Sequence, residues 1–207
     1  MQDDATIHVI DDDEGVRRSL AFLLRSAGIE AVAYASAIAF LDSVSAIRAG
    51  CVVTDVRMPD MNGIELLKCV RALDVALPVI VMTGHGDLSL AVEAMKAGAA
   101  DFLEKPFDDE TLLASVRLAM RPGGVDADQK ADGLEYRRRI GTLTERERDV
   151  FESLIEGHSG KTIAKSLGIS PSSVEIDRAN VMIKMNATSL SKLVRMAMIA
   201  GSVGENP

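Results

Sequence analysis

Hydrophobic positions in the first 120 residues alternate between short apolar runs and segments with helical spacing. The apolar runs, which are typical of buried strands, cover residues 7–10, 31–34, 51–55, 78–83 and 101–105. The segment after the first run has apolar residues at helical spacing and ends at Gly28, where a C-cap glycine belongs. Strand and helix patterns that alternate in this way predict an α/β fold with a doubly wound, five-stranded parallel sheet.

From Thr144 onward the pattern is purely helical. Thr144 and Glu147 have the spacing of a capping box, in which a hydroxyl and an acid close the start of a helix. The first helix ends at Gly157, and three more are expected at residues 159–167, 172–185 and 189–200. A glycine-containing turn at residues 168–171 separates the second and third helices. This arrangement predicts an all-α domain of four helices with a helix-turn-helix motif.

A polar, glycine-containing stretch lies between the two patterns. We therefore predict a first domain over residues 1–121, a linker over residues 122–139 and a second domain over residues 140–207. A continuous helix across the linker is an alternative, but Pro122 and the glycines disfavour it.

Charge divides unevenly between the two parts of the chain. Residues 1–134 hold 12 Lys+Arg and 22 Asp+Glu, net −10, whereas residues 135–207 hold 11 and 9, net +2, and the two sum to −8. An acidic front and a mildly basic back indicate different partners, and the back permits nucleic-acid binding without requiring it.

The location of the protein is inferred from hydropathy and cysteine usage. No apolar run reaches the roughly 20 residues of a membrane span, and the acidic N-terminus lacks a secretion signal. Cys51 and Cys69 form no metal-binding or redox motif and are expected to be reduced thiols. We expect a cytoplasmic protein that does not associate with a membrane.

Polar side chains close four of the five apolar runs. They are Asp11 with Asp12, then Asp55, Thr83 and Lys105. Parallel strands joined by crossover helices end at one edge of the sheet, so these side chains should meet in one crevice. Three carboxylates suit Mg²⁺, and Asp55, which ends the central strand, is the best-placed nucleophile for an acyl phosphate.

Each of these residues also has a purely structural interpretation. The aspartates at 11–13 could cap a helix, Asp55 could begin a turn, Thr83 could be a strand residue and Lys105 a surface lysine. Their coincidence at successive strand ends favours a shared site. A Mg²⁺-dependent phosphohydrolase and a phosphate-independent binding module remain alternatives, but a haloacid-dehalogenase-type enzyme would need an acid where Arg57 stands.

Four motifs in this part resemble the receiver domain of bacterial two-component response regulators, which has a flavodoxin-like fold. They are Val9–Asp13, Thr54–Pro59, Met82–Gly84 and Glu104–Phe107. The resemblance implies that a histidine kinase phosphorylates Asp55. It implies a site for Mg²⁺ (or Mn²⁺) formed by Asp12, Asp55 and the backbone carbonyl of Arg57, with Asp11 acting largely through water.

The same resemblance assigns a switch and a dimerisation surface. Thr83, Lys105 and Phe102 would respond to phosphorylation, and the Lys105–Pro106 peptide would be cis. Val92 and Lys96 are candidate contacts in a phosphorylation-dependent homodimer. We further hypothesise that the side chains of Arg57 and His85 overhang the acyl phosphate and tune its lifetime.

The second half resembles the LuxR-type output domain of the NarL/FixJ subfamily, on the segments 143–147, 163–170 and 174–182. A small helical docking domain is the alternative. The DNA contacts expected in the groove and at phosphates are Lys161, Ser172, Ser173, Glu175, Ile176, Arg178, Ala179 and Lys184. The family often has a basic or polar residue at the position of Ser172. Asp177 is a second departure, since an acid there would repel phosphates if it faced the DNA.

The two resemblances together imply a transcription factor rather than an enzyme. Phosphorylation by a cognate histidine kinase would drive dimerisation, and the dimer would bind promoter DNA and act on RNA polymerase. The subfamily resemblance points to nitrogen-fixation or oxygen-responsive genes.

Overall fold

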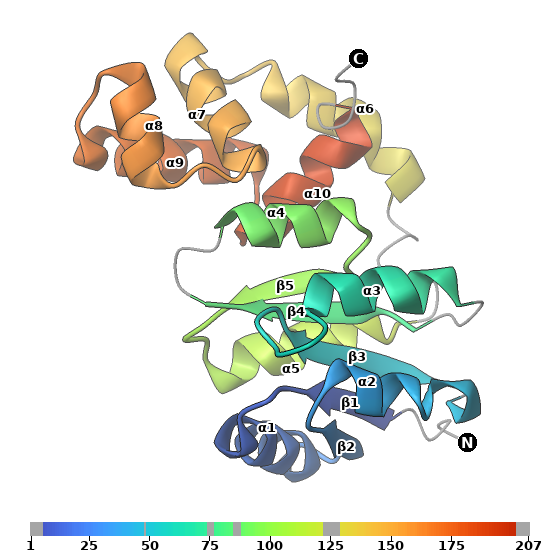
Figure 1. Ribbon diagram of the computed structural model, residues 1–207. Coiled ribbons are helices and arrows are strands. Elements are labelled where there is room, and N and C mark those ends of the chain that lie inside the picture. Colours follow the sequence, from blue (N-terminus) through green and yellow to red (C-terminus); the bar gives the residue numbers. More distant parts are fainter. Residues whose placement is uncertain (1–5, 48, 74–76, 85–87, 122–128, 202–207) are drawn as a thin grey trace. The chain divides into compact units, whose positions relative to one another are not determined.

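The five predicted strands form a single sheet in the computed structural model, which describes residues 6–47, 49–73, 77–84, 88–121 and 129–201 (Figure 1). The strands are β1 (Thr6–Ile10), β2 (Ala31–Tyr34), β3 (Gly50–Asp55), β4 (Val79–Thr83) and β5 (Asp101–Glu104). Their order is β2-β1-β3-β4-β5, and every neighbouring pair is parallel. The chain therefore winds in one direction from β1 to β2 and in the other from β3 to β5, which confirms the doubly wound topology.

Helices follow the strands much as the periodicity predicts. They are α1 (Glu14–Ser26), α2 (Ala37–Leu41), α3 (Gly63–Ala72), α4 (Leu88–Lys96) and α5 (Asp109–Ala119), with a short 3₁₀ turn, η1, at Val44–Ala46. Polar side chains cap several of their N-termini by accepting orphan backbone N–H groups. Asn62 and Glu65 form a reciprocal capping box at α3, a signal that the sequence carries at the expected spacing.

Side chains that alternate along the strands fill the two faces of the sheet. Ile7 and Val9 point to the face where residues of α1 and α5, such as Leu24 and Leu112, complete an aliphatic core. His8 points to the opposite face, where its ring packs 5.6 Å from that of Phe40 in α2, measured between centroids. Burial lowers the pKa of His8, which favours the neutral form of the imidazole on this face.

The C-terminal part is helical throughout its described residues. The helices are α6 (Gln129–Ile140), α7 (Glu145–Ile155), α8 (Gly160–Leu167), α9 (Pro171–Met185) and α10 (Leu190–Ala200). The last four match the predicted four-helix domain. Helix α6 lies in the segment predicted as a linker, for which the sequence pattern indicates no independent helix.

Local chemistry explains the boundaries of the helix-turn-helix. Thr144 and Glu147 make both bonds of the predicted capping box at α7. Gly168 adopts a left-handed conformation, φ 65°, and ends α8. Ser170 caps α9, and Pro171 occupies its first turn, where a missing N–H costs nothing. The turn between α8 and α9 is therefore fixed by three adjacent local signals.

The chain divides into two compact units. One comprises Met1–His85 and Ala97–Val125, and the other comprises Gly86–Lys96 and Asp126–Pro207. The domain boundaries predicted from the sequence stay a prediction. Among the described residues, none of the helices is both long and apolar enough to traverse a bilayer.

Gly63 allows α3 to begin directly against the end of β3. Its amide donates to the Val56 carbonyl at 2.9 Å, and a Cβ at this position would lie 2.2 Å from the backbone oxygen of Asp55. Backbone atoms cannot rotate away, so the added methyl group must displace the start of α3 or the end of β3.

We therefore expect Gly63→Ala to lower the free energy of unfolding of the unit that contains the sheet by about 1–3 kcal/mol, the usual cost of overpacking. Thermal unfolding followed by circular dichroism measures this. Gly15→Ala is the control, because its methyl group, in the first turn of α1, meets only the side chain of Asp13. Equal melting temperatures for the two variants would contradict the prediction.

Candidate functional site

Strand register brings the predicted residues together at one edge of the sheet. Ile10 pairs with Thr54, Asp55 with Met82, and Thr83 with Glu104. Asp11 and Lys105 directly follow β1 and β5, so they extend the same edge. The pairing therefore places these strand ends together, as the topology rule predicts.

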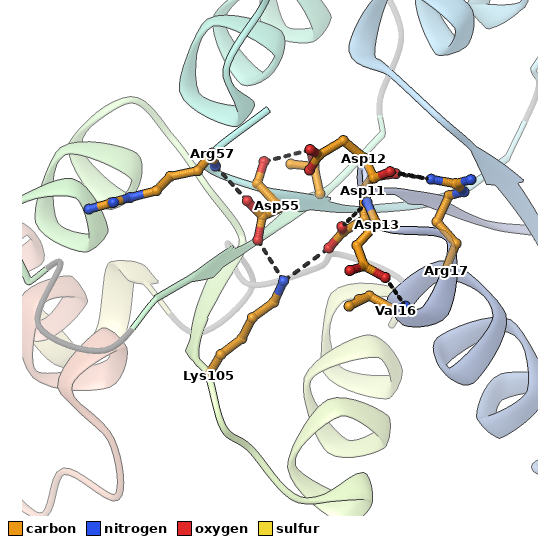
Figure 2. Close-up of polar contacts among 9 residues, drawn as sticks. Asp11, Asp12, Asp13, Val16, Arg17, Asp55, Arg57 and Lys105 are labelled. Carbon is orange, nitrogen blue, oxygen red and sulfur yellow. Dashed lines mark hydrogen bonds and ion pairs between the residues drawn. The ribbon is translucent and has the colours of Figure 1, made fainter. Parts of the chain in front are cut away.

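Lys105 joins two carboxylates that come from different strands. Its Nζ donates to Asp55 Oδ1 at 2.6 Å and to Asp11 Oδ2 at 2.9 Å (Figure 2). Partial burial by itself lowers the pKa of the Lys105 ammonium, but the hydrogen bonds and charges of Asp55 and Asp11 outweigh it, and the net pKa is raised. Lys105 is thus held as a cation between two largely buried acids.

The second oxygen of Asp55 is also engaged. The backbone N–H of Arg57 donates to Asp55 Oδ2 at 2.5 Å, while the Arg57 side chain extends away from the carboxylate (Figure 2). The side chain therefore does not overhang Asp55 in its unmodified form, and the hypothesis that it overhangs the acyl phosphate stays a prediction. His85, its proposed companion, lies outside the described residues.

Arg17 is a site residue that the sequence reasoning missed. Its Nη1 donates to the backbone carbonyls of Asp11 and Asp12, at 2.8 and 2.9 Å (Figure 2). Asp13 donates its backbone N–H to Asp11 Oδ1 and caps α1 by accepting from Val16 N. The only signal in the sequence is an arginine in the first turn of a helix that starts with an acidic loop.

Of the predicted switch residues, Thr83 ends β4, Phe102 lies within β5 and Lys105 directly follows β5. Thr83 and Phe102 are both buried, and the Thr83 carbonyl accepts from the backbone N–H of Lys105 at 2.8 Å. The Lys105–Pro106 peptide is cis, as the resemblance implies. Of the predicted dimer contacts, Val92 is buried and Lys96 is exposed.

The side chains at this edge that could ligate a metal ion are carboxylates, which offer oxygen atoms. Asp11 and Asp55 share one ammonium, and the side chain of Asp12 is exposed beside them. No group of three His, Cys, Asp or Glu side chains in the described part of the chain already has the geometry of a metal centre. Oxygen donors of this kind suit Mg²⁺ or Mn²⁺ and do not suit a soft metal.

In the second unit, α9 presents one exposed stripe. Ser172, Ile176, Ala179 and Ile183 are exposed at spacings of three and four residues, whereas Val174, Val181 and Met185 are buried on the opposite side. Ile176 is 61% exposed. An exposed isoleucine on the second helix of a helix-turn-helix has no core to fill, and it is available to a binding partner.

The other predicted DNA contacts differ in their surroundings. Lys161 and Glu175 are exposed, whereas Ser173 and Arg178 are half-buried. Lys184 donates to Glu147 Oε2 in α7 at 2.5 Å. This hydrogen bond is the main cause of the lowered pKa of Glu147, and it ties α9 to α7.

Asp177 does not face outward. Its side chain is 3% exposed, and its carboxylate is paired with the guanidinium of Arg146 in α7. We therefore do not expect Asp177 to repel DNA phosphates, because its charge is buried and is paired with a base within the unit. Arg146 is a second residue that the sequence reasoning missed.

Known protein families match both the N-terminal and the C-terminal part of the chain. Residues 7–117 match the response regulator receiver domain, and residues 141–197 match the bacterial regulatory proteins of the luxR family. Together these segments account for most of the chain.

The similarity to named relatives extends over nearly the whole chain. The chain is 54% identical over 201 residues to the transcriptional regulatory protein FixJ of Azorhizobium caulinodans, covering 97% of this chain and 95% of the relative. It is 51% identical over 199 residues to FixJ of Bradyrhizobium diazoefficiens, covering 96% and 97%. These relatives are transcriptional regulators rather than enzymes.

A solved structure supports the same conclusion. The crystal structure of full-length FixJ from B. japonicum is 51% identical, covers 97% of this chain and 98% of that chain, and has a TM-score of 0.56. The chain therefore belongs to the response regulators, as a FixJ-like transcriptional regulator that joins a receiver domain to a LuxR-type helix-turn-helix domain.

Proposed function

We propose that a histidine kinase phosphorylates Asp55 and that this modification controls binding of the LuxR-type domain to promoter DNA. The observation that carries the proposal is the contact between Lys105 Nζ and Asp55 Oδ1, 2.6 Å long, at the edge where β1, β3 and β5 end. A carboxylate beside a fixed ammonium is suited to accept a phosphoryl group, because the ammonium stabilises the charge that develops during transfer.

The transfer needs little chemistry from the protein. A carboxylate oxygen of Asp55 bonds to phosphorus as the bond from phosphorus to the kinase histidine breaks, and the product is an acyl phosphate. Asp11, Asp12, Asp55 and the Arg57 carbonyl would hold Mg²⁺ or Mn²⁺, which neutralises phosphoryl oxygens when bound. Arg17 positions the backbone that carries Asp11 and Asp12.

Phosphorylation of Asp55 would change which atoms accept hydrogen bonds from the Lys105 ammonium. Both oxygens of unmodified Asp55 already accept hydrogen bonds, from Lys105 and from Arg57 N. A phosphoryl group adds acceptors that Thr83 and Lys105 can reach from the ends of β4 and β5, and Phe102 in β5 would follow Thr83. The two states thus differ in their contacts, as any shift of equilibrium requires.

The output would be a homodimer on a symmetric promoter site. Lys96 is the exposed proposed dimer contact, and Val92, which is buried here, would join it only if the packing of α4 changed. The exposed stripe of α9 would read bases while Lys161, Ser173, Arg178 and Lys184 approach phosphates. RNA polymerase would be the downstream partner. The likeness to the FixJ transcriptional regulatory proteins supports the proposal that the target genes are nitrogen-fixation or oxygen-responsive genes.

We expect Asp55→Asn to reduce phosphate incorporation from radiolabelled acetyl phosphate and Mg²⁺ to background, and to abolish the dimerisation that accompanies it. Scintillation counting and size-exclusion chromatography measure the two effects. Asp13→Asn is the matched control, because an amide still caps α1 and the residue makes no contact with Lys105. Undiminished labelling or dimerisation of Asp55→Asn would refute the mechanism.

Arg17→Met should weaken Mn²⁺ binding by roughly tenfold, because groups that orient metal ligands typically contribute that much or more to affinity. Free Mn²⁺ is quantified by electron paramagnetic resonance in a titration of the full chain. Arg18→Met removes the same charge from an exposed neighbour on α1 and should bind Mn²⁺ like the parent protein. Equal affinities for the two variants would show that Arg17 does not organise the site.

Ile176→Ser should alter base preference without altering stability, since the side chain is largely exposed. Loss of an apolar contact with a thymine methyl group would cost about 1 kcal/mol, or roughly fivefold in affinity for the preferred site. Site selection from random duplexes in the presence of acetyl phosphate and Mg²⁺ tests this. Leu134→Ser, at an apolar residue of α6 that is 80% exposed, is the control. An unchanged consensus would remove Ile176 from the proposed readout.

A further inference from the structure

A buried acid lies in the middle of the proposed recognition helix. Asp177 in α9 stands between Val174 and Val181 on the core side, and its side chain is 3% exposed. A buried carboxylate is costly unless a cation and hydrogen bonds compensate it. In a helix that approaches DNA, an uncompensated carboxylate would also repel phosphates.

Arg146 supplies the compensating charge with two-point geometry. Its Nη2 donates to Asp177 Oδ1 at 2.9 Å, and its Nε lies 2.8 Å from Asp177 Oδ2. Only the first of these contacts has hydrogen-bond geometry; Asp177 Oδ2 is buried without a hydrogen bond and is held by the ion pair alone. Yet the Arg146 side chain is 59% exposed, so one edge of the group meets the acid and the rest meets solvent.

The position of Arg146 is fixed by a second tie between the same two helices. Glu147, the next residue of α7, accepts from Lys184 of α9. Asp177 and Lys184 are seven residues apart and therefore share one flank of α9 with Ser173 and Asn180. That flank borders the exposed stripe, so Arg146 is held beside the surface that would enter the groove.

We propose that Arg146 binds a DNA phosphate through the guanidinium N–H groups that Asp177 does not occupy, and that Asp177 acts as its positioning residue. The inference rests on the proposed function as a DNA-binding protein. An arginine has five N–H donors in a rigid fork, and the pair with Asp177 takes only the Nε and Nη2 side. Arginine is well suited to phosphates, and side chains that flank the recognition helix commonly contact the backbone of the duplex.

A purely structural role for Arg146 predicts a different result from a phosphate contact, and a double variant distinguishes the two roles. If Arg146 only compensates Asp177, removing both charges in Arg146→Ala/Asp177→Asn should leave DNA binding as in the parent. If Arg146 contacts a phosphate, the double variant still lacks one contact. One phosphate contact contributes about 0.9 to the slope of log affinity against log salt on B-DNA.

The experiment measures affinity by fluorescence anisotropy with the full chain, acetyl phosphate and Mg²⁺, on a duplex selected with the parent protein. Over a fourfold rise in salt, we expect the parent to lose about 3.5-fold more affinity than the double variant. Asp177→Asn alone should keep the parent slope, and Arg146→Lys should keep the slope with weaker binding. Circular dichroism must show that each variant is folded and unfolds in a cooperative thermal transition.

Arg117→Ala is the matched control. Arg117 is 56% exposed and ion-paired with Glu110 in α5, so its removal deletes the same charge at the same exposure in the receiver domain. A double variant with the slope and affinity of the parent would overturn the role of Arg146 while leaving DNA binding intact. A parent protein without salt-dependent binding to any selected duplex would overturn the proposed function itself.

Discussion

The receiver site depends on one ammonium that is shared by two carboxylates. Asp11 and Asp55 would repel each other at the distances that Lys105 imposes, and Lys105 offsets that repulsion with a hydrogen bond to each. The three residues lie at the ends of β1, β3 and β5, and the parallel sheet in the observed order brings those ends to one edge. Under the proposed phosphorylation of Asp55, Lys105 would have to change its hydrogen bonds, and this would link the modification to β5, in which Phe102 lies buried.

The second unit also pairs buried acids with bases, but there the pairs join two helices. Two acids, Glu147 and Asp177, are buried, and each is paired with a base on the facing helix. These pairs tie α7 to α9 at two points and place a base beside each buried carboxylate. Removing either base alone would leave a buried carboxylate without its cation, so each pair matters to the packing of α7 against α9.

The sheet, its edge and most helices were predictable, because local sequence patterns indicate each strand and helix and topology rules then predict how the strands are arranged. Asp11, Asp55, Thr83 and Lys105 each end an apolar run, and parallel pairing then brings them together. Helix α6 was not predictable, because it is polar, contains Gly133 and is anchored by tertiary bonds such as Arg137 to the Ala200 carbonyl. The burial of Asp177 could have been found, since Val174, Asp177 and Val181 share one face, but its charge argued against that interpretation.

Charge exposure also changes how the weak basic bias of the second half should be interpreted. A count over residues 135–207 gives net +2, yet that count treats Glu147 and Asp177 as if they faced solvent. In the structure both acids are buried, while their partners Lys184 and Arg146 remain partly exposed. The field just outside this flank of α9 is therefore more positive than the sum of charges, because the positive end of each pair lies nearer to solvent. A domain can thus attract a polyanion with few excess bases when its acids are turned inward.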